Sequence, residues 1–293
     1  MEGRQKEYLA SGNPPFCGSP LLVLDAHVHI YPCFDLPEFF AAAFSNCLQI
    51  ARSVGYGRSH IPVLLLTEGC RQRVFQDIQE EMKKGNNRIG DGQNAGYRVF
   101  PTEENGSLRI QKGDGTYLFL VAGRQIVTSE QLEVLALSTV SEIPDGLSLE
   151  KTVADVEKDR AVPVIPWGFG KWYGWRRRVL MQYLAPRRER VIFLGDNGGR
   201  PSILKFPDFQ RIAPGASFKV LPGSDALPLP SELKKVGSFG FTLQEKLDLR
   251  RPGGALKQLL SNPGVVPMPY GSPESISRFA RNQIALRIWK HRI

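Results

Sequence analysis

Two histidines and an aspartate occupy alternate positions where a short apolar segment ends. The segment is residues 22–30, LVLDAHVHI, and its polar members are Asp25, His27 and His29. Alternate residues of a β-strand point to the same face, so these side chains are expected to share one. Two imidazoles side by side can bind one divalent ion, with zinc, manganese or iron preferred. The spacing predicts a metal site, although local hydrogen bonding would also explain two neighbouring histidines.

The segments that follow alternate between amphipathic helices and short apolar strands. Helical spacing of apolar residues extends over residues 35–54, 71–84, 148–159 and 175–184. Buried strands are expected at residues 62–67, 161–165, 191–194 and 218–221. Pro37 suits the first turn of its helix and Ser148 suits an N-cap. Repeated strand–helix units imply a parallel sheet, and their number favours a closed or nearly closed α/β barrel.

The rest of the chain fits one domain with loosely held ends. Residues 1–20 are polar and rich in glycine and proline, so a flexible arm is expected before a single domain over residues 21–293. Residues 97–121 have the turn signals of hairpin strands. Residues 222–273 are loop-rich, and residues 275–290 have the pattern of a terminal amphipathic helix.

Composition favours a globular protein with anionic partners. The chain has 42% hydrophobic residues and a formal net charge of +9. We interpret its basic clusters, residues 176–178 and 187–190, as solvated helix surface, and no aromatic-interleaved nucleic-acid motif accompanies them.

The four cysteines form no CxxC pair. No apolar run is long enough to span a bilayer and no signal segment is visible, so a cytoplasmic protein without membrane contact is expected.

Polar residues also follow the other expected strands. They are Glu68, Gln125, Glu133, Lys171, Asp196 and Asp225. The carboxyl ends of the strands of a parallel barrel face one common mouth, so these side chains are candidates for a single site with the two histidines. An ordinary solvated loop residue is an equally good explanation for any one of them alone.

The order of these segments resembles the PHP superfamily, named for polymerase and histidinol phosphatase. Its members are distorted α/β barrels that hydrolyse phosphate esters with a cluster of metal ions. The DxHxH opening of the family matches residues 25–29, and its late GSDAH segment resembles residues 223–227, GSDAL. Its TDHD and GxEIST segments resemble residues 67–70 and 123–128. The resemblance implies a distorted (β/α)7–8 TIM-like barrel, with His27, His29 and Asp225 as metal ligands.

The chain departs from that family where further ligands would stand. Residues 67–70 lack the histidine, Gln125 replaces a bridging glutamate, and Leu227 replaces the last histidine. The amidohydrolase superfamily is the alternative resemblance, because its members also have an HxH motif at an early strand and an aspartate at a late strand. Some of its members use a carboxylated lysine, which Lys171 would supply.

Position and resemblance together assign a role to each candidate residue. The metal ligands would be His27, His29, Asp225 and Glu68, the catalytic residues Glu133 and Lys171, and the substrate-binding residues Arg200, Trp167 and Asp196. Such a site would hold a zinc, manganese or iron ion and hydrolyse a phosphate ester or other anionic small molecule. The departures leave a second hypothesis, a barrel that has lost catalysis and serves in binding or assembly. Nucleic-acid processing has less support from the sequence.

Overall fold

The computed structural model describes most of the chain from the first strand onward. The described residues are 19–90, 96–168, 172, 174–186, 191–207 and 217–290. The flexible arm expected over residues 1–20 lies outside them, apart from its last two residues. Lys171 and the basic residues 187–190 also lie outside the described residues.

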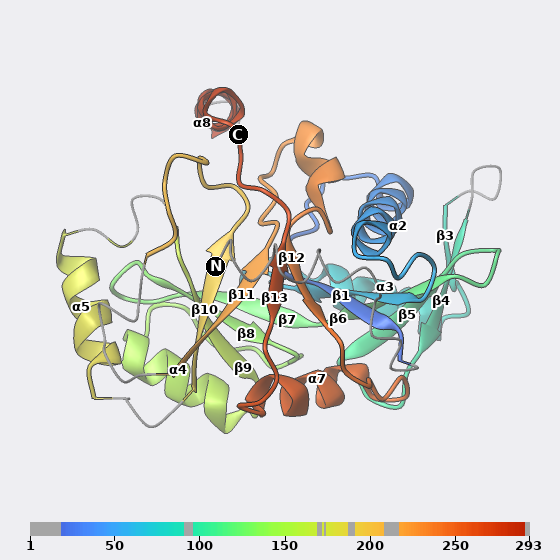
Figure 1. Cartoon of the computed structure of the whole chain (residues 1–293), viewed down its shortest axis with the longest axis horizontal. Helices are drawn as coiled ribbons and strands as arrows, with labels where there is room; N and C mark the ends of the chain where they lie inside the picture. Colours follow the sequence, from blue (N-terminus) through green and yellow to red (C-terminus); the bar gives the residue numbers. More distant parts are fainter. Residues whose placement is uncertain are drawn as a thin grey trace.

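Eight of the described strands form one mixed sheet, in the order β13-β12-β1-β2-β6-β5-β4-β3 (Figure 1). In that order they are Met268–Tyr270, Gly240–Leu243, Leu21–Val28, His60–Leu66, Tyr117–Val121, Ser107–Gln111, Tyr97–Pro101 and Arg88–Ile89. Only the pairs β1–β2 and β2–β6 are parallel. The strands β4, β5 and β6 are the hairpin strands that the turn signals at residues 97–121 predict.

The other five described strands form a second sheet, in the order β11-β10-β9-β8-β7. They are Ser217–Gly223, Val191–Asn197, Val162–Pro166, Glu133–Leu137 and Gly123–Val127. The strands β9, β10 and β11 run parallel, whereas β7, β8 and β9 pair antiparallel. In Figure 1 the hairpins β3–β5 lie at the right end of the molecule, and this sheet lies left of its centre.

Five helices lie close to the positions that the sequence predicts: α2 (Leu36–Ser53), α3 (Val74–Lys83), α4 (Leu149–Lys158), α5 (Gly174–Leu184) and α8 (Ile276–Lys290). The helix α7 (Pro252–Ser261) and the 3-10 helix η1 (Pro230–Lys235) lie within residues 222–273, which were expected to be loop-rich. The predicted N-cap Ser148 accepts a hydrogen bond from Lys151 N, and Asp35 caps α2 by accepting from Glu38 N. Across the described residues, no helix combines the length and apolar character needed to cross a membrane.

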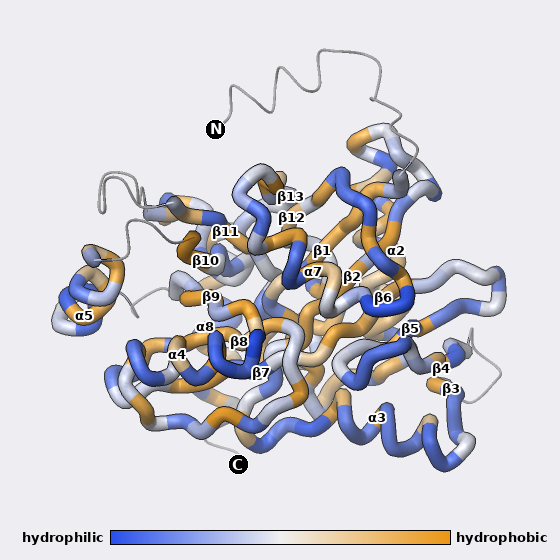
Figure 2. Tube along the Cα trace, turned by 90° about the horizontal axis from the view of Figure 1, so that it is seen from below, coloured by the Kyte–Doolittle hydropathy of each residue, from blue (hydrophilic) through white to orange (hydrophobic). Residues whose placement is uncertain are grey.

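Strand β1 is buried along its whole length and has different partners on its two faces. Leu22 and Leu24 pack in a cluster that the two sheets share, with Val164 and Leu221 of the second sheet. Leu21 and Val23 pack instead beneath α2, against residues that include Cys47. Figure 2 shows hydrophobic residues concentrated in the strands and hydrophilic ones along α3. The core therefore holds β1, and the polar residues at its end, in a fixed position.

The prediction of a closed TIM-like barrel is wrong, because the described strands form two mixed sheets rather than one closed ring. A strand has two hydrogen-bonding edges. In β1 one edge pairs with β2, and β12 takes the other along residues 22–24 in antiparallel register, so no edge is left there for β11. At the other seam, β2 and β7 are linked through a single bridge between Glu68 and Arg124.

Both seams between the sheets carry a glycine that the other sheet approaches closely. A Cβ on Gly223 would lie 2.2 Å from His27 N, and one on Gly123 would lie 2.3 Å from Leu66 O. No side chain fits at such distances from backbone atoms, so these positions require glycine for space.

We therefore expect Gly123→Ala to destabilise the fold by about 1–3 kcal/mol, because the seam must open to admit the methyl group. Gly106→Ala is the matched control, since nothing lies within 4 Å of the Cβ position there. The control should change the free energy of unfolding by no more than about 0.5 kcal/mol. Urea denaturation of both variants measures the difference, and equal stabilities would contradict the close approach at the seam.

Candidate metal centre

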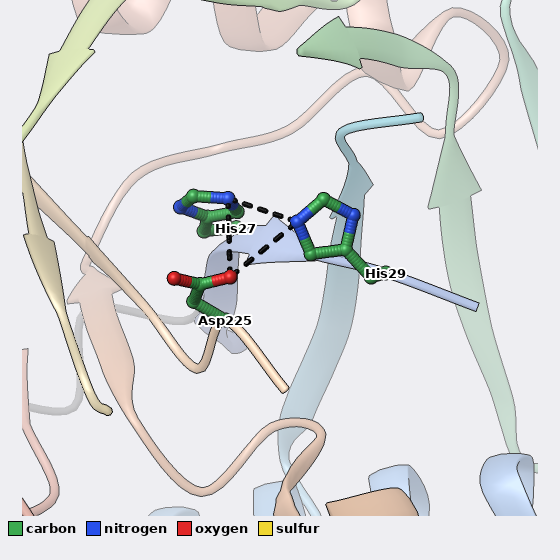
Figure 3. A group of neighbouring side chains, drawn as sticks. All are labelled: His27, His29 and Asp225. Atoms are coloured by element: carbon green, nitrogen blue, oxygen red, sulfur yellow. Dashed lines mark hydrogen bonds and ion pairs between the residues drawn. The ribbon is translucent and has the colours of Figure 1, made fainter. Parts of the chain in front are cut away.

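Three side chains with ligand atoms converge beside the end of β1. His27 lies in β1, His29 directly after it, and Asp225 in the loop after β11 (Figure 3). The Nε2 atoms of the two histidines are 3.1 Å apart. Asp225 Oδ1 lies 3.5 Å from Nε2 of His27 and 3.4 Å from Nε2 of His29. Both histidines are buried and Asp225 is partly buried. The convergence expected from the sequence, between residues that are 196 positions apart at His29 and Asp225, is thus present.

Backbone contacts between the two sheets bring Asp225 to the histidines. Asp225 N donates to His27 O at 2.8 Å, directly beside Gly223 at the seam. Asp225 itself has φ +44°, in the left-handed region that a residue with a side chain rarely adopts. A strained backbone of this kind is retained where the surroundings enforce it, and here it aims the carboxylate at the imidazoles.

Asp25 does not join this group, although strict alternation along β1 would place it there. Pairing between β1 and β2 shifts register between Asp25 and Val28, so the alternation is broken after Asp25. The Asp25 carboxylate instead accepts backbone hydrogen bonds from Ser224 N and Gly237 N, both at 2.8 Å. Burial raises the pKa of Asp25 to about 6, and the hydrogen bonds it accepts oppose that rise. Asp25 thus ties the end of β1 to the backbone next to Asp225.

The arrangement fits a transition-metal ion. Ligands about 2.0–2.1 Å from zinc at tetrahedral angles stand about 3.3 Å apart. The three distances of 3.1, 3.4 and 3.5 Å between the donor atoms are close to that value. Burial lowers the pKa of His27, although the nearby Asp225 carboxylate opposes this effect, so His27 favours the neutral form that binds metals. Two nitrogens and one oxygen suit zinc, manganese or iron better than magnesium.

Two amide side chains hold these groups in place, and of the two the sequence named only Gln125 as a candidate. Gln125 Oε1 lies 3.0 Å from His27 Nε2, and its amide nitrogen donates to Glu133 Oε1 at 3.2 Å. Asn197 Nδ2 donates to Asp225 Oδ2, which leaves Oδ1 facing the histidines. Such outer partners fix the orientation of ligands. Gln125 lies in the middle of β7, whereas Asn197 is the last residue of β10, and that position next to the candidate Asp196 is a signal that could have indicated it.

The two predicted acidic residues lie at different distances from this group. Glu133 is half-buried and reaches His27 through Gln125, so it borders the site. Glu68 stays outside the three-residue group. Its carboxylate accepts from Phe75 N at 2.9 Å and lies 3.9 Å from Arg124, at the seam of β2 and β7. Burial raises the pKa of Glu68, and these two contacts oppose the rise.

The residues predicted to bind substrate are engaged elsewhere in the described structure. Arg200 Nε and Nη2 donate to the two oxygens of Asp196, at 2.7 and 3.1 Å, and Nη1 donates to Leu204 O. Trp167 is buried in a cluster that includes α4 and α5, and its ring packs edge-on against Phe206. The structure therefore pairs Asp196 with Arg200 and uses Trp167 in the core. The role predicted for Lys171 stays a prediction, since that residue is outside the described part.

A cleft among the described residues is separate from the three ligands. It has a volume of about 1040 Å³ and lies between the first turns of α2, one side of α3 and the strands β3 and β4. Phe34 lines it, and the Phe34 ring contacts Tyr31, whose ring stacks on His29. The aromatic pair thus stands between the cleft and the histidines.

No family model and no curated protein matches this chain. Among solved structures, the lesion-specific endonuclease PfuEndoQ from Pyrococcus furiosus aligns with a TM-score of 0.50 and 11% identity, over 86% of this chain and 59% of that one. PsfC from Pseudomonas syringae PB-5123 aligns with a TM-score of 0.47 and 13% identity, over 93% of this chain and 98% of that one. An endonuclease Q bound to a 27-mer duplex with an abasic lesion gives 0.44 and 12%, over 81% and 57%. Sequence identities this low show a likeness of fold alone. Of these three structures, only PfuEndoQ reaches a TM-score of 0.50.

Proposed function

We propose that this protein is a metal-dependent hydrolase of phosphate esters, with its metal held by His27, His29 and Asp225. The observation that carries the proposal is the triangle of three donor atoms, which has the edge lengths of a tetrahedral metal site. The PHP-like order of the segments that supply these residues supports the phosphate ester as substrate. The fold shared with part of an endonuclease is consistent with that substrate class.

A bound divalent ion would lower the pKa of a water ligand toward neutrality and polarise a phosphoryl oxygen. The chain's own residues would then orient the reactants. Asn197 holds Asp225 with one oxygen toward the histidines, and Gln125 connects His27 to Glu133. Glu133 is the carboxylate bordering the site in the described part, so we assign it the role of proton acceptor.

A phosphodiester in DNA is the second candidate substrate, and two observations favour it. The TM-score of 0.50 is to a lesion-specific endonuclease, and the net charge of +9 suits a polyanion. On α5, Arg177 and Arg178 are exposed and Arg176 is half-buried, as the prediction of a solvated helix face requires. A DNA footprint would make binding fall steeply with rising salt, because bound phosphates release counterions.

A substrate panel on the tag-free protein tests the proposal. We expect p-nitrophenyl phosphate, bis-p-nitrophenyl phosphate or a DNA oligonucleotide to be hydrolysed with Mn²⁺ or Zn²⁺, and the rate to return to background after chelation. Oligonucleotide binding measured from 50 to 500 mM salt then separates DNA from small esters. Absence of both bound metal and turnover would overturn the proposal and favour a binding or assembly role.

A further inference from the structure

Tyr31 forms one wall of the candidate metal centre. Its ring stacks on His29, with centroids 5.4 Å apart and an interplanar angle of 28°. On its other side it meets Phe34 edge-on, with centroids 5.5 Å apart and an angle of 83°. Two aromatic contacts of this kind leave the ring little freedom, so the position of the hydroxyl is well defined.

Tyr31 lies within electrostatic reach of the acidic residues around the site. Burial raises its pKa well above the usual range, and the negative charges of Asp225 and Glu133 raise it further. A tyrosine hydroxyl keeps its proton at neutral pH, so it is available as a hydrogen-bond donor.

This hydroxyl makes no hydrogen bond to any residue in the described part of the chain, and it is not sealed from solvent. Tyr270 shows the ordinary arrangement, because its buried hydroxyl is within hydrogen-bond distance of Leu24 O and Gly237 O. An accessible hydroxyl without a protein partner bonds to water, which an entering molecule can displace. The donor of Tyr31 is thus free for a molecule that enters the site.

Three other side chains near the site already donate to acceptors, whereas the buried Nδ1 of His29 has no partner among the described residues. Gln125 donates to Glu133 and Asn197 to Asp225. Arg200 donates to Asp196 and to a backbone carbonyl. A phosphoryl group presents only acceptor oxygens, so it requires a donor that is not engaged in this way.

We infer that Tyr31 binds substrate by donating a hydrogen bond from its hydroxyl to a non-bridging phosphoryl oxygen. The inference rests on the proposed function, since it assumes a phosphate ester at His27, His29 and Asp225. It adds a specific contact that neither the sequence motifs nor the metal ligands supply, and it assigns the stacking of Tyr31 on His29 a role in positioning that contact.

Binding of inorganic phosphate to the metal-loaded, tag-free full chain tests this contact, using isothermal titration calorimetry. Tyr31→Phe keeps the ring between His29 and Phe34 and removes only the hydroxyl. We expect its phosphate affinity to fall about tenfold, as for a hydrogen bond to a charged acceptor. Tyr117→Phe is the matched control, since Tyr117 is at the start of β6, and it should bind phosphate like the unchanged protein. Metal content should be about one ion per chain in all three proteins.

The results separate this inference from the proposed function. Equal phosphate affinity of Tyr31→Phe and the unchanged protein, at equal metal content, would overturn the inference and leave the metal site intact. Loss of metal in Tyr31→Phe would also overturn it, because the hydroxyl would then act on the metal site. An unchanged protein that binds no metal would overturn the proposed function and this inference with it.

Discussion

Replacing His27 and His29 together by alanine is expected to abolish metal binding. The unchanged protein should contain about one transition-metal ion per chain, because its three donor atoms have the spacing of a tetrahedral site. The double variant retains Asp225 alone, and one carboxylate does not hold zinc, manganese or iron in competition with water. Elemental analysis of tag-free protein, dialysed after loading, measures the ratio of metal to chain.

His60→Ala is the matched control for this experiment. His60 begins β2, at the end of the strand far from the site, and its removal should leave about one ion per chain. Metal retained by the double variant would show that the ion binds elsewhere. Metal absent from the unchanged protein would mean that the two histidines and Asp225 only hydrogen-bond to one another.

Changing Asp225 to asparagine should lower hydrolysis of a phosphate ester by at least about a hundredfold. The amide has the shape of the carboxylate but no charge. Asn197 Nδ2 donates to Oδ2 of Asp225, so the variant would keep its oxygen there and turn its NH₂ group toward the histidines. An NH₂ group cannot bind a metal ion, and the fold should survive because the backbone hydrogen bond to His27 O remains. Steady-state kinetics with p-nitrophenyl phosphate gives the ratio, and circular dichroism checks the fold.

Asp114→Asn makes the same chemical change in an exposed turn, where Asp114 accepts from Thr116 N. It should turn over substrate at the rate of the unchanged protein. If Asp225→Asn kept full turnover with an intact fold, the chemistry would lie at another place in the chain.

The residues at the end of β1 could be predicted from sequence because local spacing decides their position. His27 and His29 are two residues apart, and both imidazoles reach Asp225. The same spacing wrongly predicted that Asp25 would share the face of the two histidines. The register shift next to Asp25 arises from the pairing of β1 with β2. That shift depends on residues far away in the chain, so no pattern within residues 22–30 indicates it.

The closed barrel was the wrong inference because a repeated strand–helix pattern does not reveal which edges pair. Strand β12 has only four residues, Gly240–Leu243, in a region expected to be loop-rich, yet it takes the free edge of β1. The pairing of Asp196 with Arg200 had no comparable signal. Asp196 lies in β10 and Arg200 in the turn after it, where the four-residue spacing of charge pairs on a helix does not apply.

The position of β12 has a consequence for synthesis of the protein on the ribosome. Strand β1 ends at Val28 and β12 begins at Gly240, 212 residues later. At about 5–20 residues per second, roughly 10–40 s pass between the appearance of the two strands. During that time the nascent chain presents an apolar strand with one open edge, which can pair with another copy of itself. Chaperones that shield nascent chains would act on β1 in this interval, and its release would follow the arrival of β12.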